Sequence, residues 1–247
     1  MRVAGQGSSR DRLLNAGKSL FAARGYDGTT TAAIAKAAGT SHSQLIKHFR
    51  DKRGLLQALL EAAWQQLGSA MSLAIERIGN PVERLRLVIN MFLSAVQKDR
   101  QTAAVLMLDG GTVHEEDGRP LISGGYARFS AILDEIVEAM KLGGELRADV
   151  QPVAFRAALM ACLEKFVRDR MVAAAVPGMA SYSEAELQSV IFGLFAGCLE
   201  TKVSEALEQP ASSSIPLAVA AASDDEAWIR QYTGLAETLL KTPGGNA

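Results

Sequence analysis

The sequence predicts an all-α fold in which a small N-terminal three-helix unit precedes a larger helical domain. Apolar residues recur at spacings of three and four along nearly the whole chain, and no sustained strand alternation appears. Of the 26 basic and 27 acidic residues, residues 1–54 hold ten and three, a balance of +7, which leaves 16 and 24 for residues 55–247, a balance of −8. Because residues 1–54 are basic and residues 55–247 are acidic, we expect only residues 1–54 to bind a polyanion.

The composition is that of a folded globular chain, with 48% hydrophobic and 21% charged residues, which excludes collagen-like and wholly disordered classes. The N-terminus lacks an apolar stretch of signal-peptide length, and the longest apolar run, residues 190–199, is far shorter than the roughly 20 residues of a membrane-spanning helix. We therefore expect a cytoplasmic protein without a membrane partner. Cys162 and Cys198 lie in apolar runs without CxxC spacing, which predicts small buried hydrophobic residues rather than metal ligands or a disulfide.

The first two helices are short and closely spaced. The first repeats apolar residues at helical spacing from Leu13 to Phe21 and is expected to stop at Gly25. The second begins after the three threonines at 29–31 and is about two turns long, because Gly39 ends it. These stops predict two helices joined by a turn, with a further helix after the second glycine.

The third helix spans about residues 41–49. Ser41 followed three residues later by Gln44 matches a capping box, in which the two side chains satisfy backbone N–H groups. On a wheel at about 100° per residue, Leu45 and Phe49 mark the buried face. The outward residues are Ser43 and Lys47, with Arg50 near them and Gln44 on the flank. This pattern predicts a helix-turn-helix unit whose third helix enters the DNA major groove.

Longer helices are predicted behind this unit, over residues 51–78, 81–98, 100–109, 122–142, 150–176 and 183–207. Asp51 offers a cap for the first of them, and Ser183 with Glu186 forms a second capping box. The glycine-rich, acidic residues 109–125 predict a loop and residues 208–222 a linker. A last amphipathic helix is expected after a third capping box, and its residues are Ser223, Glu226, Trp228, Tyr232, Leu235 and Leu239.

Two of these helices lack a clear polar face. Residues 153–163 and 190–199 are apolar nearly all round, so both segments must be buried on most sides. Gly193 and Gly197, one turn apart, would admit a close neighbour. A second subunit would supply that neighbour, which predicts a homodimer, and a central helix in a monomeric bundle is the alternative. The candidates for this interface are Phe155, Leu159, Leu163, Ile191, Gly193, Leu194, Gly197 and Cys198.

The stretch LLNAGKSLFAARGYDGTTTAAIAKAAGTSHSQLIKHFRDKRGLLQALL closely resembles the N-terminal domain of tetracycline-repressor-type (TetR family) transcriptional regulators. The shared residues are Leu20, Phe21, Gly25, Tyr26, Thr29, Thr30, Ile34, Ala35, Ala38, Gly39, Ser41, Leu45, His48, Phe49, Lys52, Leu55 and Leu56. The resemblance implies a helix-turn-helix DNA-binding domain over residues 1–54 and a larger helical ligand-binding and dimerisation domain over residues 55–247. It also implies a homodimer on a near-palindromic double-stranded DNA operator.

The resemblance further implies which residues lie at the DNA. Its DNA-binding residues are Thr29, Thr30, Ser41, His42, Ser43, Gln44, Ile46, Lys47, His48 and Lys52. Two positions depart from the family pattern. Ile46 stands where a tyrosine hydroxyl usually reaches the DNA backbone, and Ser43 stands where glycine is common. We therefore expect modestly weaker DNA binding.

A small, mainly apolar effector is expected among the methionines and aromatic residues of the larger domain, although each one singly is more simply explained as core. The candidates are Met71, Met91, Phe92, Met107, Phe129, Met140, Met160 and Phe166. Such an effector would shift the fourth helix, which joins the two domains, and so change the separation of the two DNA-binding heads.

The sequence lacks a nucleophile with its base, a phosphate-binding loop and a dinucleotide motif, so we expect neither enzymatic activity nor a cofactor. His42 and His48 point in different directions and His114 opens an acidic loop, so no metal site is expected. The prediction is a ligand-responsive transcriptional repressor. One alternative is a helix-turn-helix regulator whose larger domain only dimerises or recruits a protein partner. Another is an interaction module that binds no specific DNA.

Overall fold

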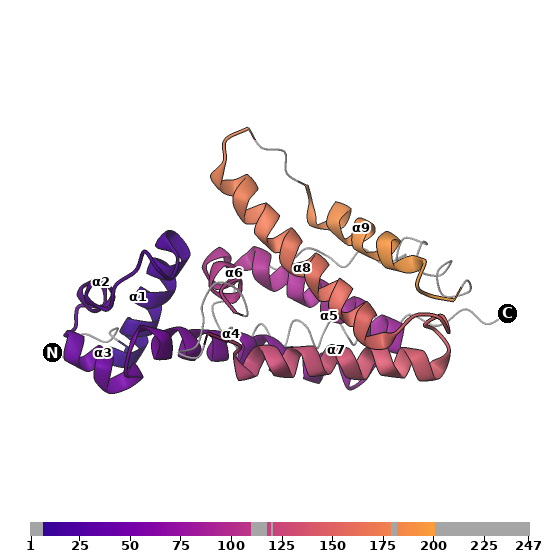
Figure 1. The fold of residues 1–247 in the computed structure, drawn as a ribbon, viewed down its shortest axis with the longest axis horizontal. Helices are drawn as coiled ribbons and strands as arrows, with labels where there is room; N and C mark the ends of the chain where they lie inside the picture. Colours follow the sequence, from indigo (N-terminus) through magenta and orange to yellow (C-terminus); the bar gives the residue numbers. More distant parts are fainter. Residues whose placement is uncertain (1–6, 110–117, 120, 179–181, 201–247) are drawn as a thin grey trace.

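The computed structural model describes residues 7–109, 118–119, 121–178 and 182–200 (Figure 1). Within these ranges the predicted all-α fold is confirmed, and the one β feature is an isolated antiparallel bridge between Leu146 and Leu199. The helices are α1 (Ser9–Arg24), α2 (Thr31–Ala37), α3 (His42–Phe49), α4 (Lys52–Ile75), α5 (Pro81–Lys98), α6 (Arg100–Leu106), α7 (Gly124–Gly143), α8 (Pro152–Ala175) and α9 (Glu184–Ala196). None of these described helices is long and apolar enough to cross a membrane.

Helices α1–α3 form a small body at one end of the molecule, and α4 leads from it into a larger helical bundle (Figure 1). The small body has its own buried centre, made by Leu13, Phe21, Ile34, Leu45 and Phe49. These residues come from all three helices, so the orientation of α3 is fixed by packing as well as by its flanking turns.

Side-chain caps fix where the first helices begin. Ser8 and Asp11 form a reciprocal capping box on α1, and Gly25 ends this helix with φ 70°, in the region that favours glycine. The Thr30 hydroxyl accepts a hydrogen bond from the Ala33 backbone N–H at 3.2 Å. Asp51 caps α4, as predicted, by accepting from the Gly54 backbone N–H at 2.7 Å.

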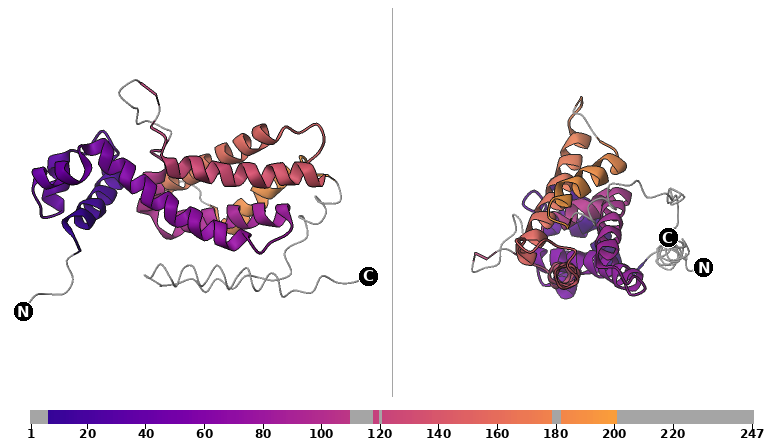
Figure 2. Two further views of the ribbon diagram at one scale, coloured as in Figure 1. Left: turned by 90° about the horizontal axis from the view of Figure 1, so that it is seen from below. Right: turned by 90° about the vertical axis from the view of Figure 1, so that its right-hand side faces the viewer.

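In the larger body, α4 packs against α5, α6 and α7, while α8 lies against α7 and contacts α5 and α6 (Figure 2). Trp64 of α4 lies at the centre of an aromatic cluster, with ring centroids 5.0 Å from Phe129, 5.7 Å from Tyr126 and 6.4 Å from Phe92. A Cβ at Gly125 would lie 2.3 Å from the Trp64 Cβ. Only glycine therefore permits the close approach of α7 to α4.

Several helices are shorter than their periodicity predicts. α4 ends at Ile75 rather than 78, α6 at Leu106 rather than 109, and α9 at Ala196 rather than 207. The chain leaves α9 because tertiary hydrogen bonds compete with the helix: Arg147 N donates to Cys198 O at 3.1 Å, and Glu200 N donates to the carbonyl of residue 145 at 2.9 Å. The predicted linker over 208–222 and the last helix from Ser223 lie outside the described residues.

Candidate nucleic-acid interface and ligand cavity

Helix α3 presents a polar face over a buried apolar one. Leu45 is fully buried and Phe49 nearly so, as the wheel predicts, whereas Ser43 and Lys47 are exposed. Ile46 is 41% exposed and lies on the outer side with them. This arrangement leaves a hydroxyl, a primary ammonium and one apolar side chain free to meet the edges of bases or the sugar-phosphate backbone.

The start of α3 is capped by one half of the expected capping box. The Ser41 Oγ accepts from the Gln44 backbone N–H at 3.3 Å and lies 2.9 Å from the Ser43 Oγ. The reciprocal bond from the Gln44 side chain to the Ser41 backbone is not formed between these two described residues. The half-buried Gln44 amide is therefore not used by the cap.

Both histidines of α3 connect it to neighbouring helices. The His42 Nε2 lies 3.0 Å from the Thr31 Oγ1 of α2, and the His48 Nε2 lies 2.9 Å from the Ser9 Oγ of α1. Both rings are exposed at the rim of the polar face. Among the described residues no cluster of histidine, cysteine or carboxylate groups could hold a metal ion.

Two predicted DNA-binding residues instead support the fold. Thr29 is 1% exposed, and its hydroxyl donates to the carbonyls of Leu20 at 3.2 Å and Gly25 at 2.8 Å, which braces the turn between α1 and α2. Its assignment as a DNA contact is therefore corrected. Lys52 donates to the Tyr26 carbonyl at 3.0 Å, and its Nζ lies 4.0 Å from the centroid of that ring. The Lys52 ammonium thus already has two partners within the chain.

The small body is joined to the larger one by polar contacts between α1 and α6. Lys18 forms an ion pair with Asp99, and the Ser19 hydroxyl donates to the Gln101 side chain at 3.2 Å. Asp99 also caps α6 through the backbone N–H groups of Gln101 and Thr102, both at 3.0 Å. Burial raises the pKa of Asp99, but the hydrogen bonds from Lys18 and Thr102 outweigh it and lower that pKa below its usual value. This carboxylate therefore connects α6 to the α3-bearing body.

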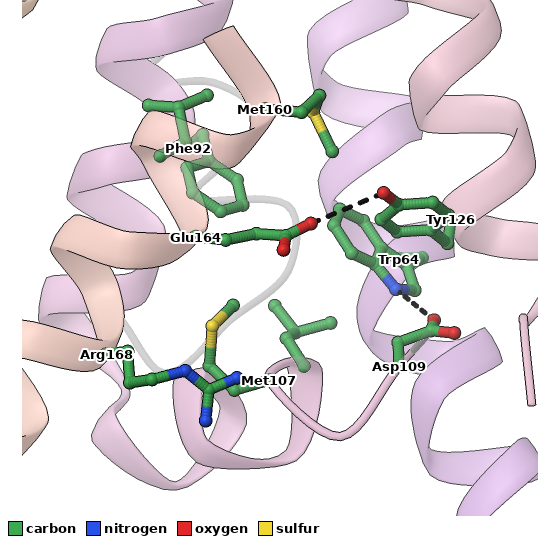
Figure 3. A pocket seen from close by; sticks show the side chains of 10 residues that line it. Trp64, Phe92, Met107, Asp109, Tyr126, Met160, Glu164 and Arg168 are labelled. Atoms are coloured by element: carbon green, nitrogen blue, oxygen red, sulfur yellow. Dashed lines mark hydrogen bonds between the residues drawn. The ribbon is translucent and has the colours of Figure 1, made fainter. Parts of the chain in front are cut away.

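A cavity of about 100 Å³ lies between α4, α6, α7 and α8 (Figure 3). Its lining residues are Trp64, Phe92, Leu106, Met107, Asp109, Tyr126, Met160, Leu163, Glu164 and Arg168. Of the eight predicted effector-pocket residues, three lie here: Phe92, Met107 and Met160. Phe129 packs behind Trp64, and Met71, Met91 and Met140 are fully buried away from this lining. Phe166 instead packs against Tyr182, so these five residues belong to the general core.

Sequence reasoning missed the polar residues of this cavity. Asp109 is buried and accepts from the Trp64 Nε1 and the Ser123 backbone N–H, both at 2.8 Å, and from the Ser123 hydroxyl. The Tyr126 hydroxyl donates to Glu164 at 3.3 Å. Burial, together with the charge of Glu164, raises the pKa of Tyr126, so this phenol stays protonated as a donor. The sequence signal that could have identified them is the pair of charged residues, Glu164 and Arg168, that interrupts the apolar residues of α8.

The structure divides the predicted interface residues into two groups. Phe155, Leu159, Leu163 and Ile191 are each 4% exposed or less, because they pack against the chain's own core, so their assignment to a subunit interface is corrected. Leu194 is 60% exposed, Gly193 and Gly197 are also exposed, and Cys198 is half-buried. Neither cysteine forms a disulfide. Exposed apolar side chains nevertheless remain on α8, at its C-cap and on α9: Val153, Val172, Val176, Val190 and Leu194.

Residues 13–59, which span α1–α3 and the start of α4, match the family described as bacterial regulatory proteins, tetR family. Residues 13–59 therefore form a TetR-family DNA-binding domain. A helix-turn-helix unit followed by a helical bundle is also the arrangement of solved structures of this family, whose members are DNA-binding transcriptional regulators rather than enzymes.

Individual relatives agree with this membership. The chain is 28% identical over 171 residues to the HTH-type transcriptional repressor KstR2 of Mycobacterium tuberculosis, which covers 68% of this chain and 80% of that protein. It is 25% identical over 134 residues to the nucleoid occlusion factor SlmA of Vibrio vulnificus, covering 54% of this chain and 68% of that one. The crystal structure of FadR from Bacillus subtilis in complex with stearoyl-CoA shares the fold, with a TM-score of 0.64, 21% identity, and coverage of 74% of this chain and 96% of that one.

Proposed function

We propose that this TetR-family regulator is a ligand-responsive repressor that binds a near-palindromic operator as a homodimer in the cytoplasm. The observation that carries the proposal is the exposed polar face of α3 on a body with a charge balance of +7. Residues 1–54 read the DNA, and residues 55–247 bind the effector and the second subunit. In such a dimer the two α3 helices enter successive major grooves, about 34 Å apart or slightly more.

We propose that a second copy of the chain covers the exposed apolar side chains of α8 and α9. Five large apolar side chains of these helices are 44–61% exposed, and Gly193 and Gly197 offer no side chain against a close neighbour. An apolar patch of this kind is typical of a protein interface, and a two-fold axis would pair the face with itself.

Leu194→Asp is expected to convert the dimer to monomer at micromolar protein, because a carboxylate at the self-paired face appears twice and loses its hydration. Sedimentation velocity measures this change. Leu142→Asp is the matched control, since Leu142 is 87% exposed at the far end of α7 and should leave the mass of the particle unchanged. A dimer that persists in the Leu194 variant would contradict the proposed face.

The effector would act through α6 as well as through α4. Leu106 and Met107, at the end of α6, line the cavity, while Asp99 at the other end holds Lys18 of α1. Trp64 of α4 lines the same cavity. A ligand that favours another position of α6 or α4 therefore changes the orientation of the DNA-binding head, provided that it binds the DNA-incompetent state more tightly.

Lys18→Met is expected to reduce, by about threefold to tenfold, the factor by which the effector weakens DNA binding, because it removes one connection between α6 and the head. Fluorescence anisotropy with labelled operator, with and without effector, gives that factor. Lys98→Met is the control, since Lys98 is exposed one residue before Asp99. If the effector weakens DNA binding by the same factor in the Lys18 variant, the coupling between the cavity and the DNA-binding domain runs through α4 rather than α6.

The central experiment uses the purified protein and the DNA that flanks its gene. We expect an inverted repeat in that DNA to be protected from nuclease, and a screen by thermal shift to find a compound that stabilises the protein and releases the repeat. SlmA, a relative named for nucleoid occlusion rather than for transcriptional control, leaves a second candidate in which the larger domain only dimerises or recruits a protein partner. Specific DNA binding without any releasing compound would support that second candidate.

Ile46→Tyr is expected to tighten operator binding about threefold to tenfold, because a hydroxyl at this exposed position of α3 would restore the phosphate contact usual in the family. Anisotropy titrations give the dissociation constants. Ile46→Phe adds the ring without the hydroxyl and should stay close to the unsubstituted protein. Equal affinities for the tyrosine and phenylalanine variants would show that the hydroxyl does not reach the DNA.

A further inference from the structure

The cavity described above combines aromatic and methionine walls with a half-buried carboxylate. Trp64, Phe92 and Tyr126 supply the aromatic walls, and the carboxylate of Glu164 points between them (Figure 3). An aromatic ring presents a negative face, so walls of this kind attract a cation near the carboxylate. The volume of about 100 Å³ is about two thirds of the roughly 150 Å³ that holds benzene, so a single ring fits only when the flexible methionine side chains of the wall move.

The charged residues that line this cavity are two carboxylates, Asp109 and Glu164, and one arginine, Arg168. Asp109 accepts from neutral donors, the Trp64 indole and the Ser123 backbone and hydroxyl. Glu164 accepts from the Tyr126 hydroxyl, over a long 3.3 Å. Among the residues that line the cavity, neither carboxylate has a cationic partner.

Three arginines of α7 and α8 do not neutralise these carboxylates. Arg156 is paired with Asp134 at 2.8 Å, and Arg128 is paired with Glu61. Arg168 lines the cavity, but its side chain is exposed and forms no ion pair with Glu164, one helical turn away. Solvent at Arg168 weakens its attraction for a ligand, whereas Glu164 is surrounded by aromatic rings and acts in a lower dielectric.

We propose that this cavity binds a small organic cation, a protonated amine carried on about one ring, with Glu164 as its counter-ion. The inference rests on the proposed function, in which this cavity is the effector site. The ammonium N–H groups donate to Glu164, which has unused acceptor capacity, and the ring packs against Trp64 and Phe92. The flexible side chains of Met107 and Met160 let the walls adjust to the ring.

An anionic ligand of the same size fits these groups poorly. Its charge would meet Glu164 and Asp109 inside the cavity, and only the exposed Arg168 could pair with it. A large polyanion such as stearoyl-CoA, the ligand in the FadR crystal structure, exceeds the volume and meets the same charges.

The test compares three probes of nearly equal shape on the full-length protein by isothermal titration calorimetry at pH 7. The probes are 2-phenylethylammonium, 2-phenylethanol and phenylacetate. We expect the cation to bind at least tenfold more tightly than the alcohol, because a charge-assisted hydrogen bond exceeds a neutral one by this amount, and the anion to bind more weakly than both. Preference for the anion would assign Arg168 as the anchor, and equal binding of all three, or of none, would overturn the proposal.

Two variants test whether the cation binds at Glu164. Glu164→Gln is expected to weaken binding of the cation about tenfold to a hundredfold and leave the alcohol unchanged, since the amide keeps the shape and removes the charge. Glu138→Gln, an exposed position on α7 outside the cavity lining, is the control and should change neither. An unaltered cation affinity in the Glu164 variant overturns the assignment, and matching thermal melts show that both variants are folded.

DNA binding is measured separately, so that the two proposals fail independently. Specific binding to the operator, with no binding of the cation, would overturn the ligand assignment and leave the repressor intact. Binding of the cation, with no change in operator affinity, would support the ligand assignment and remove this compound's role as an effector.

Discussion

Replacing Lys47 by alanine should weaken operator binding about tenfold or more and reduce its dependence on salt. Lys47 is exposed on the outer face of α3, where its ammonium is available to phosphates or base edges. A dimer presents this side chain twice. Removing one phosphate contact from each subunit should lower the slope of log K against log salt by about two. Titrations at several salt concentrations, with operator and with unrelated DNA, give both quantities.

Lys165→Ala is the matched control for this experiment. Lys165 is an exposed lysine of α8, remote in sequence from α3, and its ion pair with Asp169 at 3.8 Å is a weak surface contact. We expect its affinity and salt slope to equal those of the unsubstituted protein. If Lys47→Ala behaves in the same way as Lys165→Ala, Lys47 is not a DNA contact and the orientation proposed for α3 is wrong.

Asp109→Ala should lower the free energy of unfolding by about 2–4 kcal/mol, because it leaves the buried indole N–H of Trp64 and the donors of Ser123 without their acceptor. For a chain of this size the midpoint of thermal unfolding should fall by roughly 5–15 °C. Circular dichroism melts measure the midpoint, and urea titrations measure the free energy.

Two further variants separate the hydrogen bonds from the charge. Asp109→Asn keeps one acceptor oxygen and should lie between the alanine variant and the unsubstituted protein. Asp149→Ala removes an exposed carboxylate paired with Arg147 and should leave the free energy of unfolding nearly unchanged. Equal melting of the Asp109 and Asp149 variants would mean that the Trp64 and Ser123 contacts contribute little to the fold.

Local sequence patterns were sufficient to predict the helices α1–α3 of the DNA-binding domain. The caps Thr30, Ser41 and Asp51, the stop at Gly25 and the anchors Leu45 and Phe49 act over one or two helical turns, so the sequence spacing specifies them directly. Thr29 was misassigned because its neighbour in space, the carbonyl of Leu20, is nine residues away and outside any local pattern.

The larger domain shows what periodicity cannot decide. An apolar residue on an all-apolar helix has no sequence signal for which side it faces, so Phe155 and Ile191 were assigned to a subunit face although the chain buries them itself. The cavity likewise depends on contacts between residues far apart, such as Tyr126 with Glu164 and Trp64 with Asp109.

The helical class and the start and buried face of α3 could be predicted from the amino-acid sequence, because short-range capping and amphipathicity decide these features. The basic charge of residues 1–54 follows from their composition. Three features became visible in the folded chain alone: which apolar residues remain exposed, where Asp99 joins α6 to the body formed by α1–α3, and that two carboxylates line an aromatic cavity. The physical reason is that these features depend on the packing of α4, α6, α7 and α8 against one another, which sequence spacing within a single helix does not encode.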